Sequence, residues 1–140
     1  MNSKLQPCSP ETIAKKRILV VDDNPDILTL VQFSLEDIGG WDVMTASSGD
    51  EALVKVMEEK PDAIVLDGVM PGMDSLTFLQ ELRTSPEVQF LPVVLLTGSI
   101  SLTRHIPLQD LDVVGTITKP FDPMRLSEQI AQFLGWKSIA

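Results

Sequence analysis

The sequence has one cysteine, no tyrosine, no basic excess and no long apolar run. Cys8 cannot form a disulfide within the chain, so we expect a reducing, cytoplasmic compartment. No apolar stretch approaches the roughly 20 residues of a membrane-spanning helix, and residues 1–17 lack the apolar core of a secretory signal. The formal net charge of −9 leaves no basic face for nucleic-acid phosphates. We therefore expect no binding to membranes or nucleic acid.

What the 140 residues do contain is a regular alternation of short apolar runs with segments of helical period, and the length suits one domain. Three of the runs, ILVV, AIVL and PVVLL, are apolar at consecutive positions, as expected for strands buried on both faces. Alternating strands and helices predict an α/β fold with a doubly wound, five-stranded parallel sheet and helices on both faces. The expected strands are Arg17–Val21, Asp42–Ala46, Ala63–Leu66, Pro92–Leu96 and Val113–Thr118.

Helix signals lie between these runs. Asn24 is placed to cap the first helix with Pro25 at its first position, and Asp122 is placed to cap the last. The connection after the fourth strand contains Pro107, which predicts a short or broken helix there. Trp41 and Trp136 are interpreted as packing residues. We expect a flexible extension over residues 1–16, one domain over 17–135 and a tail over 136–140.

Polar and charged residues gather where the expected strands end. Asp22 and Asp23 follow the first strand, Asp67 the third, Thr97 the fourth and Lys119 the fifth. Open parallel sheets bind ligands at the carboxyl ends of their strands. Clustered carboxylates suit Mg²⁺, a hard cation that also binds phosphoryl oxygens. A carboxylate close to Mg²⁺ and a lysine is a plausible nucleophile towards phosphorus.

These residues resemble a known family, the receiver (CheY-like) domain of two-component response regulators. The resemblance covers about residues 17–135 and rests on five features taken together in order. They are Asp22-Asp23, Asp67, the following Met70–Asp74, Thr97 and Lys119-Pro120-Phe121. It implies a flavodoxin-like strand order of 2-1-3-4-5 and a signalling protein rather than an enzyme with turnover.

The resemblance implies that Asp67 is the phosphoacceptor, receiving a phosphoryl group from a histidine kinase or a histidine phosphotransfer protein. Asp23, Asp67 and the backbone carbonyl of Val69 would bind Mg²⁺ directly, whereas Asp22 would act mainly through bound water. The chain would then signal as a stand-alone phosphoprotein through protein contacts in a phosphorelay, as a monomer or a weak phosphorylation-dependent dimer.

Thr97 and Lys119 would contact the phosphoryl oxygens, and the family pattern implies a cis Lys119-Pro120 bond. The family usually carries an aromatic residue where this chain has Thr116, so the usual conformational readout is not expected here.

Two alternatives stay open at this point. One is a degenerate receiver that acts as a phosphorylation-independent interaction module, although no residue of the acidic site is lost. The other is an aspartyl-phosphate hydrolase of the haloacid-dehalogenase type. That class needs a second aspartate two residues after its nucleophile, where Asn24 follows Asp22, and a cap domain for which the chain has no room.

Overall fold

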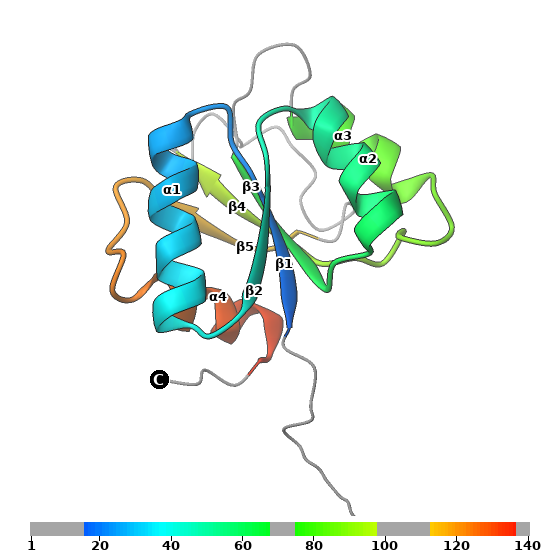
Figure 1. Ribbon diagram of the computed structural model, residues 1–140. Helices are drawn as coiled ribbons and strands as arrows, with labels where there is room; N and C mark the ends of the chain where they lie inside the picture. Colours follow the sequence, from blue (N-terminus) through cyan, green and yellow to red (C-terminus); the bar gives the residue numbers. More distant parts are fainter. Residues whose placement is uncertain (1–15, 68–74, 98–112, 137–140) are drawn as a thin grey trace, which may run out of the picture.

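The computed structural model describes residues 16–67, 75–97 and 113–136. In this part of the chain, five parallel strands form one sheet in the order β2-β1-β3-β4-β5, covered by helices on both faces (Figure 1). The strands are β1 (Arg17–Val21), β2 (Asp42–Ala46), β3 (Ala63–Asp67), β4 (Val93–Thr97) and β5 (Val113–Thr118). The doubly wound fold and the strand order predicted from the sequence are confirmed.

Two strands differ from the sequence-based prediction by one residue, β3 at its end and β4 at both ends. β3 includes Asp67, whose backbone pairs with Leu96 of β4. β4 begins at Val93 rather than Pro92. Proline has no N–H to donate to the ladder, although the Pro92 carbonyl still accepts the N–H of Ile64 at 3.0 Å.

The helices divide evenly between the two faces of the sheet. They are α1 (Pro25–Phe33), η2 (Ser34–Ile38), α2 (Gly49–Glu59), α3 (Ser75–Arg83) and α4 (Leu126–Leu134). α1 and α4 lie on one face, and α2 and α3 on the other (Figure 1). Such a division is the physical reason for continuous apolar strands, because alternate side chains of each strand enter different cores.

Both cores can be traced from β1. Leu19 and Val21 belong to the core beneath α2 and α3, whereas Ile18 and Val20 belong to the core beneath α1 and α4. Helix residues complete the first core: Ala52, Val56, Phe78, Leu79 and Leu82. Those of the second core are Val31, Leu35, Leu126, Ile130 and Ala131. The central strands are therefore held rigidly from both sides.

The start of α1 agrees with the sequence-based prediction. The Asn24 side chain accepts hydrogen bonds from the backbone N–H groups of Asp26 and Ile27, and Pro25 occupies the first turn. The helical segment ends before Gly39, as the sequence predicts, but the form of its last turn was not predicted. The last five residues, Ser34–Ile38, form a π-helix, η2. π-Helical turns are rare and carry no distinctive apolar period, so the sequence indicated one continuous helix.

The predicted cap of the last helix is wrong. α4 begins at Leu126, and Asp122 instead organises a turn before it. The Asp122 carboxylate accepts the N–H of Met124 at 2.9 Å, and its carbonyl accepts the N–H of Arg125 at 3.0 Å. An aspartate followed by proline can close a turn as readily as it can cap a helix.

Near the amino ends of the strands, Trp41 packs against Trp136, and Lys16, the first described residue, lies beside Trp136. Trp41 and Trp136 meet edge to face with ring centroids 5.1 Å apart. The Lys16 ammonium lies 5.4 Å from the centroid of the Trp136 ring. Trp41 is buried, which confirms the packing role predicted for this pair.

Several predictions fall outside the described residues. These are residues 1–15 of the expected flexible extension, with Cys8, residues 137–140 of the expected tail, and the broken helix expected around Pro107. Within the described ranges, no helix is long and apolar enough to cross a membrane.

Candidate functional site at the carboxyl edge of the sheet

The carboxyl ends of β1 and β3 lie next to each other in the middle of the sheet. Val21 pairs with Leu66, and Asp22 and Asp67 are the next residue of each chain segment. The backbones of these two aspartates therefore leave the pairing at neighbouring positions. For Asp67 the structure describes the backbone, as the last residue of β3.

Asp22 is a buried carboxylate with partners on both oxygens. Its side chain is 3% exposed, and Oδ2 lies 3.3 Å from the Lys119 ammonium, 97 residues away in the sequence. Oδ1 accepts the backbone N–H of Asn24 at 2.9 Å. Burying a carboxylate is costly unless it is paired and hydrogen-bonded, and these contacts meet that requirement.

Thr97 and Lys119 meet through the backbone at the neighbouring strand ends. Thr97 ends β4, is buried and pairs with Thr118 of β5. Its carbonyl accepts the N–H of Lys119 at 2.7 Å. The next peptide bond, Lys119-Pro120, is cis, which confirms the expectation taken from the family resemblance. The end of β5 therefore brings the lysine side chain over the middle of the sheet edge.

Asp23 differs from its neighbour because it is exposed to solvent. It directly precedes Asn24, whose side chain caps α1. The helix N-terminus bears a partial positive charge, which lowers the cost of placing two carboxylates together at the start of α1. The loop from β1 to α1 therefore presents one buried and one accessible carboxylate.

Within the described residues, no group of three or more His, Cys, Asp or Glu side chains is arranged to hold a metal ion. Of the predicted Mg²⁺ ligands, the Asp67 side chain and Val69 lie outside what the structure describes. The other two expected ligands, Asp22 and Asp23, differ in how accessible their carboxylates are to a cation. Asp22 has both oxygens occupied by protein donors, whereas Asp23 is open to a cation.

Two pockets flank the segment that follows Lys119. One, which we call the apolar pocket, has a volume of about 340 Å³ and lies between α1 and this segment. It is lined by Ile27, Leu30, Lys119, Pro120 and Phe121. The sequence gave no signal for it, since α1 and the end of β5 are far apart along the chain.

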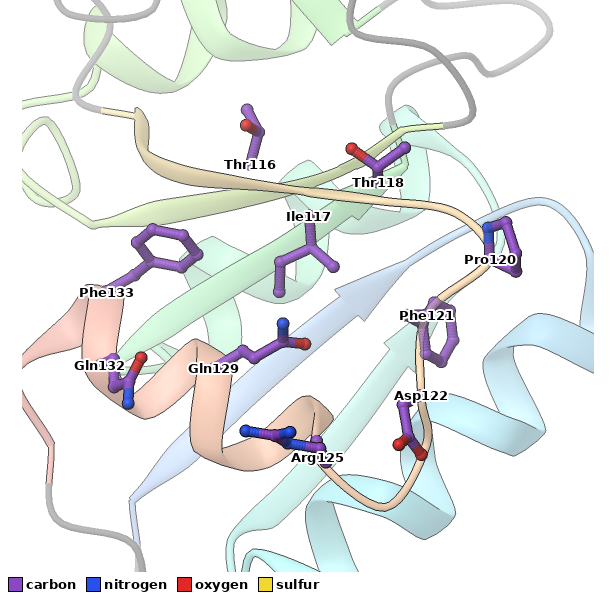
Figure 2. Close-up of a pocket in the computed structure, with 10 residues that line it drawn as sticks. All are labelled: Thr116, Ile117, Thr118, Pro120, Phe121, Asp122, Arg125, Gln129, Gln132 and Phe133. Carbon is purple, nitrogen blue, oxygen red and sulfur yellow. The ribbon is translucent and has the colours of Figure 1, made fainter.

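A second pocket of about 570 Å³ lies between β5 and α4 (Figure 2). Thr116 and Phe133 both line it. Figure 2 shows Ile117 pointing from β5 towards α4, whereas Thr116 and Thr118 point to the other side of the strand. Thr116, at the position where the family resemblance implies an aromatic ring, is therefore a small, half-buried side chain on the side of β5 opposite α4.

The start of β5 contains an irregularity beneath Phe133. Val113 pairs with Val93 but Gly115 pairs with Val94, so Val114 is an extra residue in the strand. A Cβ atom on Gly115 would lie 2.3 Å from the Phe133 ring. Gly115 is thus required because the ring rests directly on the backbone of β5.

Comparisons with known proteins agree with this architecture. The model of the response regulator receiver domain family matches residues 18–131, and the chain belongs to this family. It is 39% identical over 125 residues to the alkaline phosphatase synthesis transcriptional regulatory protein PhoP of Bacillus subtilis, covering 89% of this chain and 51% of that protein. The chain spans about half the length of the first curated relatives that it matches.

Shorter relatives match over almost their whole length. An uncharacterised 14.6 kDa protein of Leptolyngbya boryana is 34% identical over 123 residues, covering 88% of this chain and 93% of that protein. Among solved structures, the chemotaxis response regulator CheY4 of Vibrio cholerae is similar with a TM-score of 0.78 and 30% identity. That alignment covers 86% of this chain and 99% of CheY4.

Proposed function

We propose that this receiver domain accepts a phosphoryl group on Asp67 from a histidine kinase or a histidine phosphotransfer protein, in a Mg²⁺-dependent reaction. The observation that carries the proposal is the Lys119–Asp22 ion pair of 3.3 Å. It holds a cation at the strand ends beside the position where Asp67 leaves β3. A fixed positive charge there stabilises the charge that develops on a transferring phosphoryl group.

Asp67, Lys119 and Thr97 each have a role in the proposed transfer. The Asp67 carboxylate attacks phosphorus, and Lys119 neutralises a phosphoryl oxygen by exchanging its contact with Asp22 for one with the incoming anion. Thr97 ends β4 next to Lys119 and donates its hydroxyl to another phosphoryl oxygen. Thr97 ends β4, which is buried along its whole length, and the Thr97 carbonyl accepts the N–H of Lys119, which favours preorganised geometry.

Mg²⁺, when bound, neutralises the acidic cluster and polarises the phosphoryl group. We assign its direct contacts to Asp23, Asp67 and the Val69 carbonyl, and assign Asp22 to contacts through bound water. The burial of Asp22 and the protein partner on each of its oxygens support this division, because they leave Asp22 less accessible to a cation than the exposed Asp23.

The proposed output is a change in protein–protein contacts rather than turnover of a substrate, so the chain acts as a phosphoprotein. We place this activity in the cytoplasm, where a histidine kinase would meet its ATP. The similarity to a 14.6 kDa protein over 93% of its length supports a receiver working without further domains. The match to half of larger transcriptional regulators is equally consistent with a receiver linked to an output domain.

Incubation with acetyl phosphate and Mg²⁺ tests the proposal directly. Intact mass should rise by one phosphoryl group, and EDTA should prevent the gain. Asp67→Asn should abolish it, whereas Asp62→Asn, an exposed aspartate at the other edge of the sheet, should not.

The same experiment separates the alternatives. Labelling of Asp67→Asn at another aspartate would overturn the assignment. Absence of labelling together with constant partner binding would favour a phosphorylation-independent module. Continuous hydrolysis of small phosphate esters would favour a hydrolase.

A further inference from the structure

Phe90 has the highest exposed fraction, 79%, among the large apolar side chains of the described residues. It belongs to residues 84–90, a series of turns that joins α3 to β4 (Figure 1). An aromatic side chain offers a large apolar area for burial against a partner, and such residues often dominate binding. Phe90 is therefore a candidate anchor for association with another protein surface.

The backbone on either side of Phe90 is held in place. Val88 is buried in the core beneath α2 and α3, and Leu91 packs against that core. The Arg83 guanidinium donates hydrogen bonds to the Gln89 carbonyl at 3.2 Å and to the Leu91 carbonyl at 2.7 Å. The backbone would therefore lose little conformational freedom on binding, and such preorganisation favours association.

The apolar pocket of the same chain suits a phenyl ring. Its lining contains four apolar side chains and one cation: Ile27, Leu30, Pro120, Phe121 and Lys119. An enclosed apolar cavity of about 150 Å³ is large enough to bind benzene. The volume of about 340 Å³ therefore has room for a phenylalanine side chain, and the Phe121 ring offers it an aromatic contact.

Phe90 and the apolar pocket lie on opposite sides of the molecule. Phe90 comes shortly before β4, near the amino ends of the strands, whereas Pro120 follows β5 at their carboxyl ends. α1, which contributes a wall of the pocket, covers the face of the sheet opposite to α2 and α3 (Figure 1). A chain therefore cannot fill its own pocket with its own Phe90. The ring of one copy can enter the pocket of another copy in a head-to-tail arrangement.

The charges near the two surfaces favour this pairing over contact between two α1 helices. Asp23 and Asp26 are exposed at the start of α1, and α1 contains no basic residue. Two such helices facing each other would bring like charges together, which is unfavourable. On the side of Phe90, the Lys60 ammonium lies 3.2 Å from the Glu87 carboxylate, so both signs of charge are present there.

We propose that this chain associates with further copies of itself head to tail, with Phe90 of one copy inserted into the apolar pocket of the next. Each copy offers one ring and one pocket, so association continues beyond two chains. One aromatic anchor makes a small interface, and the association is accordingly weak and dependent on concentration. The contact requires neither Asp67 nor a phosphodonor, so it is independent of the proposed function.

Sedimentation velocity of the full chain tests the proposal. The weight-average sedimentation coefficient should rise between about 10 μM and about 1 mM chain, the range in which weak contacts form. Phe90→Ser and Leu30→Asn should each abolish the rise. Val54→Ser is the matched control, because Val54 is 55% exposed on α2 and does not line the pocket. That variant should keep the rise.

An equimolar mixture of the Phe90→Ser and Leu30→Asn variants gives the sharpest result. The first variant keeps the pocket and the second keeps the ring, so the mixture should form a species of two chains and nothing larger. Recovery of association would also show that both variants are folded. The inference is overturned if the unmodified chain stays monomeric over the whole range, which would leave the pocket to a different protein. It is equally overturned if the mixture fails to associate, or if Val54→Ser loses the rise as Phe90→Ser does.

Discussion

At the scale of single residues, Asp22 and Asp23 are adjacent in sequence but differ in environment. Asp22 is buried, with Lys119 and the Asn24 N–H as partners, whereas Asp23 is exposed. The two carboxylates should therefore contribute to stability with opposite signs in the absence of a cation. Asp22 forms an ion pair and a hydrogen bond that its replacement would weaken. Asp23 only adds a negative charge to a chain whose formal net charge is already −9.

Asp22→Asn should lower the free energy of unfolding without Mg²⁺ by about 1–3 kcal/mol. It removes the negative charge that pairs with the Lys119 ammonium and weakens the acceptor for the Asn24 N–H. Asp23→Asn should leave this free energy unchanged or raise it slightly, because one repelling charge is removed. Urea unfolding in EDTA measures both. Equal destabilisation by the two variants would contradict the different environments.

The same pair shows what sequence can reveal at this scale. The grouping of carboxylates at the strand ends was predictable, because apolar runs mark the strands and parallel strands end at one edge. Which aspartate is buried was not predictable. The burial of Asp22 depends on its ion pair with Lys119, which is 97 residues away in the sequence.

At the scale of elements, the start of α2 is held by reciprocal hydrogen bonds. The Ser48 side chain accepts the N–H of Glu51 at 3.1 Å. The Glu51 carboxylate in turn accepts the Ser47 N–H at 2.8 Å and the Ser47 hydroxyl at 2.9 Å. These two bonds, the backbone one first, lower the pKa of Glu51 from its ordinary 4.5, with a smaller contribution from Lys55.

A carboxyl whose pKa is lower in the folded state stabilises the fold above the unfolded-state pKa and loses that contribution as pH falls through the folded-state value. Glu51→Gln should therefore lower Tm at pH 7 by about 2 °C, corresponding to about 0.5 kcal/mol for a half-exposed group. The difference from the unmodified chain should shrink as the pH falls below 4.5 and vanish once the pH lies below the folded-state pKa of Glu51. Calorimetry from pH 3 to 7 measures it.

Glu58→Gln is the matched control, because Glu58 is exposed further along the same helix. It should show no comparable loss at pH 7. A Tm loss for Glu51→Gln that stays constant down to pH 3 would mean that ionisation of Glu51 is not responsible.

The contact between Gly115 of β5 and Phe133 of α4 supports a prediction about the stability of the domain. Gly115→Ala should destabilise the chain by about 1–3 kcal/mol, because its Cβ would overlap the Phe133 ring. Adding Phe133→Ala should recover much of that loss, since the smaller side chain leaves room for the methyl group. A double-mutant cycle in urea measures the coupling, and additive effects would contradict direct contact.

The elements also mark the limits of sequence-based prediction. β1, β2 and β5 were predicted to the residue. β1 is a buried strand with an uninterrupted apolar run, whereas the edge strands β2 and β5 contain polar residues and were placed by their position between segments of helical period. η2 and the turn at Asp122 were missed. A π-turn keeps an apolar stripe, and aspartate before proline suits both a cap and a turn, so tertiary contacts decide each case.

At the scale of the whole molecule, the proposed site and the tryptophan cluster lie at opposite edges of the sheet. A phosphoryl group can shift the conformation only as far as two states contact it differently. Lys119 supplies one such contact, but Thr116 offers no large ring to bury. Burial of an aromatic side chain contributes about 1.5–3 kcal/mol, and threonine contributes far less.

Binding of beryllofluoride with Mg²⁺ should therefore change hydrogen exchange mainly in the residues that follow Thr97 and around Pro107. Exchange of α4 and of the segments that carry Trp41 and Trp136 should stay the same. Asp67→Asn, which cannot form the complex, provides the control. Protection spreading through α4 to the tryptophan pair would show that the domain switches globally without the aromatic residue.

Because Lys16 lies beside Trp136, the first and last described residues of the domain are close together in space. Because β1 begins where α4 ends, a short peptide joining these two residues would close the domain into a ring without crossing the sheet. The chain could then be cut at an exposed turn elsewhere and keep the same neighbours in space. The linear order of its elements is one of several that this set of contacts permits.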